Sequence, residues 1–217
     1  MNIIVTGSSR GMGREIAIKF LSEGHQVFGI DISESSIDDK GYTHYVLDIA
    51  KDELPEIPYN IHVVINNAGT QGTSYDLDVN LKGLIRCTEK YVLNNSSIKA
   101  VINQAAASGT TGADFGGYVA SKGGVIAYTK YTAKEIAKYG ATCNSISFGG
   151  VLSPVNWSVM NDDNKWDKIM SMTPLKKWAT TTEAADWVYF LATVNKSCTA
   201  QDIVIDNGEM FNQKFIW

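Results

Sequence analysis

The sequence predicts an α/β protein: a Rossmann-like, doubly wound parallel sheet in a single domain that covers residues 1–217. Two observations predict this class. Short apolar runs, typical of buried parallel strands, alternate with stretches whose apolar residues recur at helical spacing. A glycine-rich turn also separates the first apolar run from the first helical stretch, which is where such a sheet carries a phosphate-binding loop. A length of 217 residues suits one domain of this kind.

The pattern assigns the elements in chain order. Apolar runs that predict strands lie at Ile3–Val5, Gln26–Ile30, His62–Ile65, Ala100–Ile102 and Asn144–Ser147. Apolar residues at helical spacing predict crossover helices at Met12–Gly24, Leu81–Val92, Val125–Ala133 and Ala184–Leu191. Little room for full crossover helices remains between Asp31 and Asp48, Asp48 and Asn66, and Gly69 and Asn80. We expect trimmed connections there.

The composition points to a small-molecule partner. A net charge of -4, from 19 basic and 23 acidic residues, offers no positive surface for nucleic acid or an anionic membrane. No run approaches the roughly 20 apolar residues of a membrane span. Cys87, Cys143 and Cys198 are far apart and odd in number, so neither a disulfide framework nor a zinc site is suggested. A strand already at residues 1–5, with no leader visible, predicts a cytoplasmic protein.

The turn after the first strand reads Thr6-Gly7-Ser8-Ser9-Arg10-Gly11-Met12-Gly13 and opens directly into the first helix. Glycines let the backbone turn tightly and approach a pyrophosphate, whose charge lies against the free N–H groups at the helix N-terminus. Alone, such a turn is weak evidence, since glycine-rich turns also occur without a ligand. Asp31 strengthens it, because an acidic residue that ends the second strand can accept hydrogen bonds from the adenosine ribose.

Two residues bear on the choice between NAD and NADP. The Asp31 carboxylate would repel the 2′-phosphate of NADP in a partly desolvated site, which favours NAD. Arg10, inside the glycine loop, is either a partner for that phosphate or a solvated surface charge. We expect NAD as the cofactor, because repulsion at the ribose is hard to avoid.

A second motif, Tyr118-Val119-Ala120-Ser121-Lys122, places a phenol and an ammonium four residues apart on one face of a helix. A nearby ammonium favours the phenolate, which predicts a lowered pKa for Tyr118 and lets it exchange a proton with an alcohol or carbonyl. As a lone pattern, this pair is usually an ordinary feature of a helix surface. Its meaning therefore depends on the rest of the chain.

Taken in order, the motifs resemble those of the short-chain dehydrogenase/reductase family over nearly the whole chain. Beyond the glycine loop and the YxxxK pair, Leu47-Asp48-Ile49 is similar to the family's adenine-contacting aspartate, Asn66-Asn67-Ala68-Gly69 to its NNAG strand end, and Asn80 to its solvent-linking asparagine. Gly149–Ser153 is similar to the segment that holds the carboxamide, Thr173–Trp178 to the PLxRxG stretch, and Ile203–Gly208 to the last strand. The resemblance implies hydride transfer between nicotinamide and a secondary alcohol or ketone.

One stretch departs from the family pattern. The family writes NxSSxxG before its tyrosine, and the second serine polarises the substrate carbonyl, whereas this chain reads Asn103-Gln104-Ala105-Ala106-Ala107-Ser108-Gly109. That register puts Ala106 at the serine position, while the commonest spacing to Tyr118 would choose Ala105. Either way the hydroxyl is missing, which typically costs about 3 kcal/mol of transition-state stabilisation. Ser108 is either a substitute or an ordinary loop hydroxyl.

The resemblance also assigns roles. Tyr118 is the expected acid/base, Lys122 its pKa modulator and ribose anchor, Asn80 the support of the lysine's link to solvent, and Ala106 the altered polariser. The residues expected at the NAD site are Gly7, Ser9, Arg10, Gly11, Met12, Gly13, Asp31, Ile32, Asp48, Ile49, Asn67, Ala68, Gly69, Tyr118, Lys122, Val151 and Ser153. No metal is implied. Because the family commonly pairs helices across a two-fold axis, we expect a homodimer or homotetramer.

The missing serine leaves two further interpretations open: a catalytically impaired NAD-binding regulator or sensor of the same ancestry, and an enzyme whose serine was replaced to trap a complex. We favour an enzyme, because Tyr118, Lys122 and Asn80 are all kept. The substrate is not identified by the sequence. Residues 70–76 and 151–175 are expected to line the pocket. The second range is expected to form a lid, and its apolar side chains, such as Trp157, favour a hydrophobic or ring-bearing alcohol or ketone.

Overall fold

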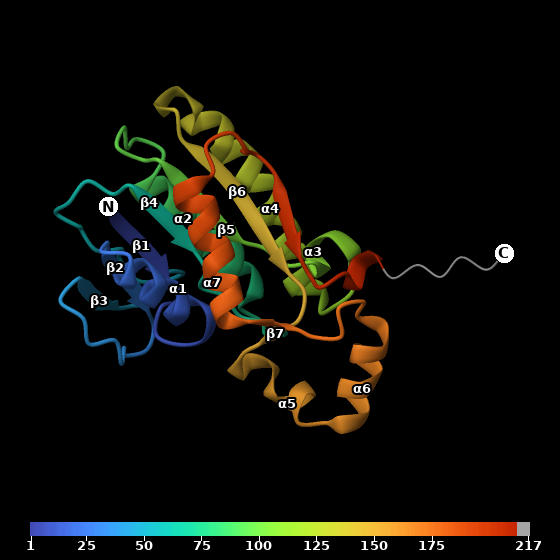
Figure 1. Ribbon diagram of the computed structural model, residues 1–217. Coiled ribbons are helices and arrows are strands. Elements are labelled where there is room, and N and C mark those ends of the chain that lie inside the picture. The colour runs from blue at the N-terminus through green and yellow to red at the C-terminus, as the bar shows by residue number, and fades with distance from the viewer. Residues whose placement is uncertain (212–217) are drawn as a thin grey trace.

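A seven-stranded sheet forms the centre of residues 1–211, the part of the chain that the computed structural model describes; the last six residues of the expected domain, 212–217, lie outside it. The strand order is β3-β2-β1-β4-β5-β6-β9 and every neighbouring pair is parallel (Figure 1). The strands are β1 (Asn2–Thr6), β2 (Gln26–Asp31), β3 (Tyr42–Val46), β4 (Val63–Asn66), β5 (Ala100–Gln104), β6 (Thr142–Phe148) and β9 (Asp202–Ile205). The order reverses between β1 and β4, which confirms the doubly wound sheet and creates the switch point at which such sheets bind ligands.

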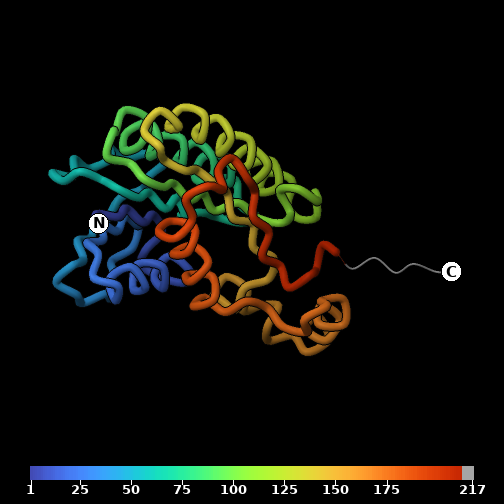
Figure 2. The backbone as a smooth tube through the Cα atoms, turned by 45° about the horizontal axis from the view of Figure 1, so that its top comes forward, coloured from blue at the N-terminus to red at the C-terminus, as the bar shows by residue number. Residues whose placement is uncertain are grey.

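Helices cover both faces of the sheet, and the predicted crossover helices are confirmed. One face carries α1 (Gly11–Ser22), α7 (Thr181–Tyr189) and the short π-helix η4 (Phe190–Val194). The other carries the short π-helix η1 (Asp78–Gly83), α2 (Leu84–Tyr91), α4 (Gly116–Ile136) and the 3₁₀ turn η2 (Ala137–Tyr139). Figure 2 shows the two sets on opposite sides of the strands.

The core lies on both sides of the sheet because successive side chains of a strand point to opposite faces. Ile3 and Val5 of β1 pack in the cluster under α1 and α7, whereas Ile4 packs in the cluster under α2 and α4. The inner strands β4 and β5 are buried along their whole length. Near-continuous apolar runs of this kind are what a sheet covered on both faces requires.

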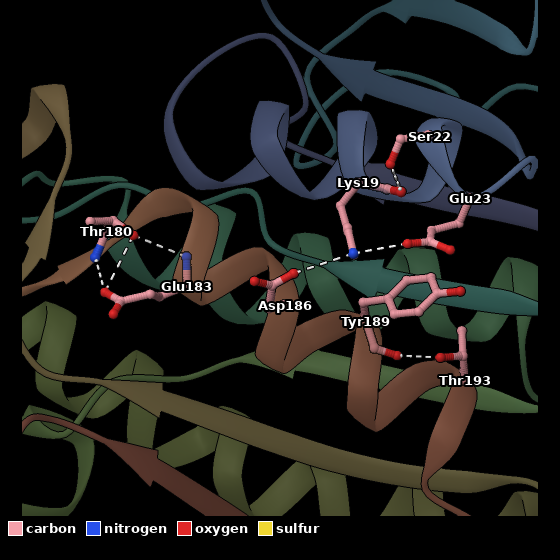
Figure 3. Close-up of polar contacts among 8 residues, drawn as sticks. All are labelled: Lys19, Ser22, Glu23, Thr180, Glu183, Asp186, Tyr189 and Thr193. Atoms are coloured by element: carbon pink, nitrogen blue, oxygen red, sulfur yellow. Dashed lines mark hydrogen bonds and ion pairs between the residues drawn. The ribbon is translucent and has the colours of Figure 1, made fainter.

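Polar contacts add specificity to the packing of α1 against α7 (Figure 3). Lys19 of α1 forms ion pairs with Glu23, at 2.9 Å, and with Asp186 of α7, at 3.4 Å, and its Nζ lies 5.1 Å from the ring centre of Tyr189. At the start of α7, Thr180 Oγ1 accepts a hydrogen bond from the main-chain N–H of Glu183, whose carboxylate accepts one from the Thr180 N–H. This capping box satisfies N–H groups that the helix itself leaves free.

The three trimmed connections are confirmed: residues 32–41, 47–62 and 70–75 contain no helix. Side chains of α2 take the place of helical hydrogen bonds in the second connection. Arg86 donates to the carbonyls of Ile49 and Asp52, and Lys90 donates to that of Leu54. Because buried backbone polar groups need partners, these three bonds hold the connection against the sheet without a helix of its own.

The segment expected to form a lid, residues 151–175, consists of short elements beyond the carboxyl end of the sheet (Figures 1 and 2). They are β7 (Val151–Leu152), η3 (Pro154–Asn156), α5 (Trp157–Met160) and α6 (Asp163–Met172), and β7 pairs with β8 (Ala179–Thr180). The remaining short helices are α3 (Ser108–Thr111) and η5 (Glu209–Phe211). Within residues 1–211, no helix is long and apolar enough to cross a bilayer.

Candidate active site

The glycine loop connects β1 to α1 at the switch point of the sheet. Gly7 and Gly11 have φ values of +69° and +55°, which side-chain-bearing residues rarely adopt. A Cβ on Gly13 would lie 1.9 Å from the Gly7 carbonyl oxygen and 2.5 Å from Asn67 Nδ2, so only glycine allows the start of α1 to approach the strand ends this closely. The loop therefore leaves main-chain N–H groups at the N-terminus of α1 facing the switch point.

Asp31 ends β2 beside this loop and is 9% exposed. Its Oδ2 accepts a hydrogen bond from the Ser9 N–H at 3.0 Å, and its Oδ1 accepts one from the Ser33 N–H at 2.9 Å. The carboxylate is thus held in place by the backbone on both sides. Arg10 is exposed on the loop, and Ile32 is 65% exposed just beyond the strand.

The residues that follow β4 are bonded to the start of the glycine loop. Thr6 Oγ1 accepts hydrogen bonds from the N–H groups of Asn67 and Ala68, both at 3.0 Å. Asn67 Nδ2 donates to the carbonyls of Thr6 and Gly7. These contacts tie the NNAG stretch to the glycine loop, while Asn67 Oδ1 is buried and has no hydrogen-bond partner among residues 1–211.

Four other residues expected at the cofactor site follow the ends of β3 and β6. Asp48 follows β3 and accepts a hydrogen bond from the Ala50 N–H. The Ile49 side chain packs into the core, 2.8 Å from where a Cβ on Gly83 would lie, so only its main chain can face a ligand. Val151 and Ser153, just beyond β6, are 3% and 6% exposed.

Tyr118 and Lys122 lie in the first two turns of α4. Lys122 is 3% exposed, and its Nζ donates to the main-chain carbonyl of Gln104 at the end of β5, at 2.8 Å. The same Nζ lies 5.5 Å from the ring centre of Tyr118. The helix therefore brings the phenol and the amine together over the carboxyl end of the sheet.

The expected lowering of the Tyr118 pKa is wrong. Burial raises the pKa of Tyr118 to about 12, and the charges of Asp114 and Asp76 act in the same direction. Burial lowers the pKa of Lys122 to about 8, against the opposing effect of Asp76. The sequence argument considered the ammonium alone, whereas desolvation disfavours the charged form of both groups.

Asn80 lies in the short π-helix η1, and π-helical turns often occur at functional sites. Its Nδ2 donates to the Thr70 carbonyl at 2.9 Å and to Ser121 Oγ at 3.0 Å, and its Oδ1 accepts from the Thr70 N–H at 2.8 Å. A Cβ on Gly69 would lie 3.0 Å from Asn80 Oδ1 and 3.6 Å from Lys122 Nζ. Asn80, Gly69 and Lys122 are therefore neighbours.

The sequence argument placed Asp76 among the residues expected to line the pocket but gave its carboxylate no role. Asp76 is 2% exposed and accepts hydrogen bonds from Thr70, Gly72 and Thr73. Burial alone would raise the pKa of Asp76, but the hydrogen bonds from Thr70, Thr73 and Gly72 lower it overall. Its charge acts on both Tyr118 and Lys122. No motif marks Asp76 in the sequence, because its partners come together only in the folded loop.

The alanine stretch that departs from the family pattern continues β5. Ala105 is 1% exposed and packs with Leu84 and Val125, on the side of the sheet that carries α4. Ala106 is 7% exposed, and the N–H groups of Ala105 and Ala107 continue the hydrogen-bond ladder to β6. Ser108 begins the short helix α3 and is partly exposed.

The residues present fit a dinucleotide. The glycine loop leaves no room for a Cβ at Gly13, acceptor oxygens stand at Asp31 and Asn67, and an amine with a titratable acid/base partner stands beyond them. A doubly wound fold with this site defines the class of pyridine-dinucleotide oxidoreductases.

The comparisons with known proteins place the chain within that class. A family model described as enoyl-(acyl carrier protein) reductase matches residues 7–209. 3-Oxoacyl-[acyl-carrier-protein] reductase FabG of Staphylococcus epidermidis is 32% identical, covering 94% of this chain and 97% of the relative. 2-(R)-Hydroxypropyl-CoM dehydrogenase of Xanthobacter autotrophicus is 28% identical over 87% of this chain and 90% of the relative. The chain belongs to the short-chain dehydrogenase/reductase family.

Solved structures share the fold at lower identity. 4-Hydroxyisoleucine dehydrogenase complexed with NADH has a TM-score of 0.88 at 22% identity, covering 98% of this chain and 99% of that chain. A putative 2-deoxy-d-gluconate 3-dehydrogenase from Agrobacterium tumefaciens with bound NADP has a TM-score of 0.84 at 23% identity, covering 97% and 96%. Ligand-free aldohexose dehydrogenase of Thermoplasma acidophilum has a TM-score of 0.86 at 23% identity, covering 100% and 96%.

Proposed function

We propose that the chain is an NAD-dependent oxidoreductase that interconverts a secondary alcohol and a ketone. The observation that carries this proposal is the convergence of Tyr118, Lys122 and Asn80 at the carboxyl end of the sheet, the end that also carries the glycine loop. When bound, the dinucleotide supplies or accepts the hydride. The chain's own residues supply binding, orientation and the proton.

Each residue has a distinct role in the proposal. The Tyr118 hydroxyl gives its proton to the substrate oxygen in reduction and takes one back in oxidation. The Lys122 ammonium anchors the nicotinamide ribose, with its Nζ also bonded to the Gln104 carbonyl. Asn80, which is bonded to the Thr70 carbonyl and to Ser121 Oγ, supports the link between the Lys122 amine and solvent protons. Ala106 leaves the substrate oxygen with one donor fewer than the family pattern provides.

NAD rather than NADP is supported by Asp31. Its carboxylate is buried and held by two backbone N–H groups, so it cannot turn away from a 2′-phosphate without losing both bonds. Arg10 is exposed on the loop and free to point to solvent. The solved structures of similar fold include complexes with NADH and with NADP, so the fold itself leaves the choice open.

The substrate we propose is an apolar ketone or its alcohol, with 3-oxoacyl thioesters among the candidates because a relative's name specifies that reduction. The lid exposes large apolar side chains: Val155, Trp157, Met172 and Leu175 are 69%, 60%, 47% and 65% exposed. Apolar walls with a few polar groups are typical of small-molecule sites.

Calorimetric titration with NADH and NADPH, followed by turnover of a ketone panel that includes 3-oxoacyl thioesters, tests the proposal. We expect NADH to bind at least tenfold more tightly and a ketone to be reduced. Equal or tighter binding of NADPH would overturn the choice of NAD and assign the 2′-phosphate to Arg10.

A second function, an NAD-binding regulator without turnover, is favoured by one observation, the methyl at position 106. Tight NADH binding together with no turnover on any carbonyl, even after a hydroxyl is restored at positions 105 and 106, would support the regulator. Turnover by the unmodified chain would exclude it.

A further inference from the structure

Gln104 carries a buried amide that no motif explains. It is the last residue of β5 and is 8% exposed, and its Oε1 has no hydrogen-bond partner within residues 1–211. Its Nε2 donates a long hydrogen bond, 3.3 Å, to the Ala105 carbonyl. Because a carbonyl oxygen can only accept, this contact fixes which end of the amide is nitrogen. The atom without a partner is therefore an acceptor.

The pleat of β5 determines where this amide points. Asn103 Nδ2 donates to Thr129 Oγ1 of α4, and Ala105 packs under α4 with Leu84 and Val125. Gln104, between them, must face the other side of the sheet. Ile102 already faces that side, in the core cluster under α1 and α7. This is also the side on which the glycine loop meets the strand ends.

A second unpartnered acceptor lies on the neighbouring strand. Asn66 of β4 pairs with Asn103 of β5, so Asn67 and Gln104 follow one residue further along adjacent strands. Both Asn67 Oδ1 and Gln104 Oε1 are buried without hydrogen-bond partners in the described part of the chain. Asn67 is bonded to the glycine loop, and the Gln104 main-chain carbonyl holds the Lys122 amine. The two acceptors thus stand between the phosphate loop and the proposed acid/base.

We propose that Gln104 is a cofactor-binding residue for the nicotinamide half of the dinucleotide. Its Oε1 accepts a hydrogen bond from a donor on the nicotinamide nucleoside, either a ribose hydroxyl or the carboxamide amino group. The inference rests on the proposed function, namely that the chain binds NAD. Three strand spacings, roughly 14 Å, separate β5 from β2. A residue on β5 and Asp31 on β2 are therefore suited to opposite ends of one dinucleotide.

Gln104→Leu tests the inference by binding rather than by activity. We expect about tenfold weaker binding of NADH by calorimetry, the effect of one buried hydrogen bond. Binding of AMP, which lacks the nicotinamide nucleoside, should not change. The thermal midpoint of the ligand-free variant should stay equal or rise, since leucine leaves no acceptor unpaired. Gln104→Met, which keeps the length of the side chain, gives the same comparison if the leucine variant does not fold.

A further ligand and a control variant identify which group donates the hydrogen bond to Gln104. ADP-ribose identifies the donor: a loss shared by NADH and ADP-ribose assigns it to the ribose, and a loss with NADH alone assigns it to the carboxamide. Thr142→Val is the matched control, because Thr142 lies at the opposite end of the sheet and is 8% exposed, and its hydroxyl has no partner among the residues that the structure describes. It should leave NADH binding unchanged.

Two results would overturn the inference. One is unchanged NADH affinity in both Gln104 variants; the other is an equal loss of NADH and AMP binding with a lower thermal midpoint, which is what a structural role predicts. The proposed function fails in a different way, when the unmodified chain does not bind NADH at all.

Discussion

Position 106 holds a methyl where the proposed reaction needs a hydrogen-bond donor. The burial of Ala105 between Leu84 and Val125 leaves Ala106 as the alanine on the same side of the strand as Gln104. This supports Ala106, rather than Ala105, as the position from which a hydroxyl would reach the substrate. The two alignments that the sequence left open therefore make different physical predictions.

Ala106→Ser is expected to raise turnover by about a hundredfold, the usual effect of one donor to a developing oxyanion. NADH affinity should change little, because the proposed cofactor contacts are made elsewhere. Steady-state kinetics on the ketone that the unmodified chain reduces, with calorimetry for NADH, measures both quantities. An unchanged rate constant would contradict the assignment of Ala106.

Ala105→Ser is the control for the other alignment. It places a hydroxyl in an apolar cluster, so it should lower the free energy of unfolding by about 1–3 kcal/mol without raising turnover. If neither serine helps and Ser108→Ala abolishes an existing activity, Ser108 polarises the substrate and both alignments are wrong.

Lys122 predicts how stability depends on pH. The pKa of Lys122 is about 8 in the folded chain against an ordinary value of 10.5, so between these pH values the unfolded chain binds more protons. The free energy of unfolding should therefore rise with pH across this window through Lys122, by at most roughly 3 kcal/mol. Denaturant unfolding at several pH values measures the rise when the unmodified chain is compared with Lys122→Met, because the buried thiols of Cys87 and Cys143, whose pKa values burial raises, act in the opposite direction.

Lys122→Met is the comparison for that measurement. The variant should be more stable than the unmodified chain near pH 7, and the difference should shrink as the pH increases from 8 to 10.5. A constant difference would mean that Lys122 keeps its ordinary pKa. The stability cost of this buried amine at neutral pH is consistent with a residue kept for function rather than for folding.

At the scale of elements, the packing of α1 against the strand ends depends on one glycine. Gly13→Ala puts a methyl within overlap distance of the Gly7 carbonyl and the Asn67 amide, so α1 must move away. We expect a loss of about 1–3 kcal/mol in unfolding free energy and at least tenfold in NADH affinity. Gly116→Ala, in open space at the start of α4, is the matched control and should preserve both. Retention of both properties by Gly13→Ala would contradict the close packing.

The shortened connections also belong to this scale. Tyr42 of β3 crosses over Gly29, where a Cβ would lie 2.0 Å from the tyrosine hydroxyl. That hydroxyl bonds Ser8 Oγ at 3.0 Å and His44 Nδ1 at 2.9 Å. A tyrosine on the edge strand thus supports the glycine loop on the side where residues 32–41 form no helix.

For the whole molecule, we predict a homodimer or homotetramer. Large aromatic side chains remain exposed on two helical faces: Tyr131 of α4 is 48% exposed, and Trp187 of α7 and Phe190 are 41% and 45% exposed. Light scattering at micromolar concentration should give a multiple of the 23.7 kDa chain mass. Tyr131→Lys and Trp187→Lys, compared separately, report which face is used. A monomer would rule out the prediction.

The sequence by itself determined the inner strands of the sheet, the crossover helices, the glycine loop and the Tyr118–Lys122 pair, because these follow from local periodicity and from spacing along a single helix. It did not mark β3, whose residues Tyr42–Val46 alternate in exposure at the sheet edge and form no apolar run. Only the tertiary structure decided the burial of Lys122, the charge of Asp76 beside it and the unpartnered amide of Gln104. Desolvation and hydrogen-bond satisfaction depend on residues brought together from distant parts of the chain, so no local pattern encodes them.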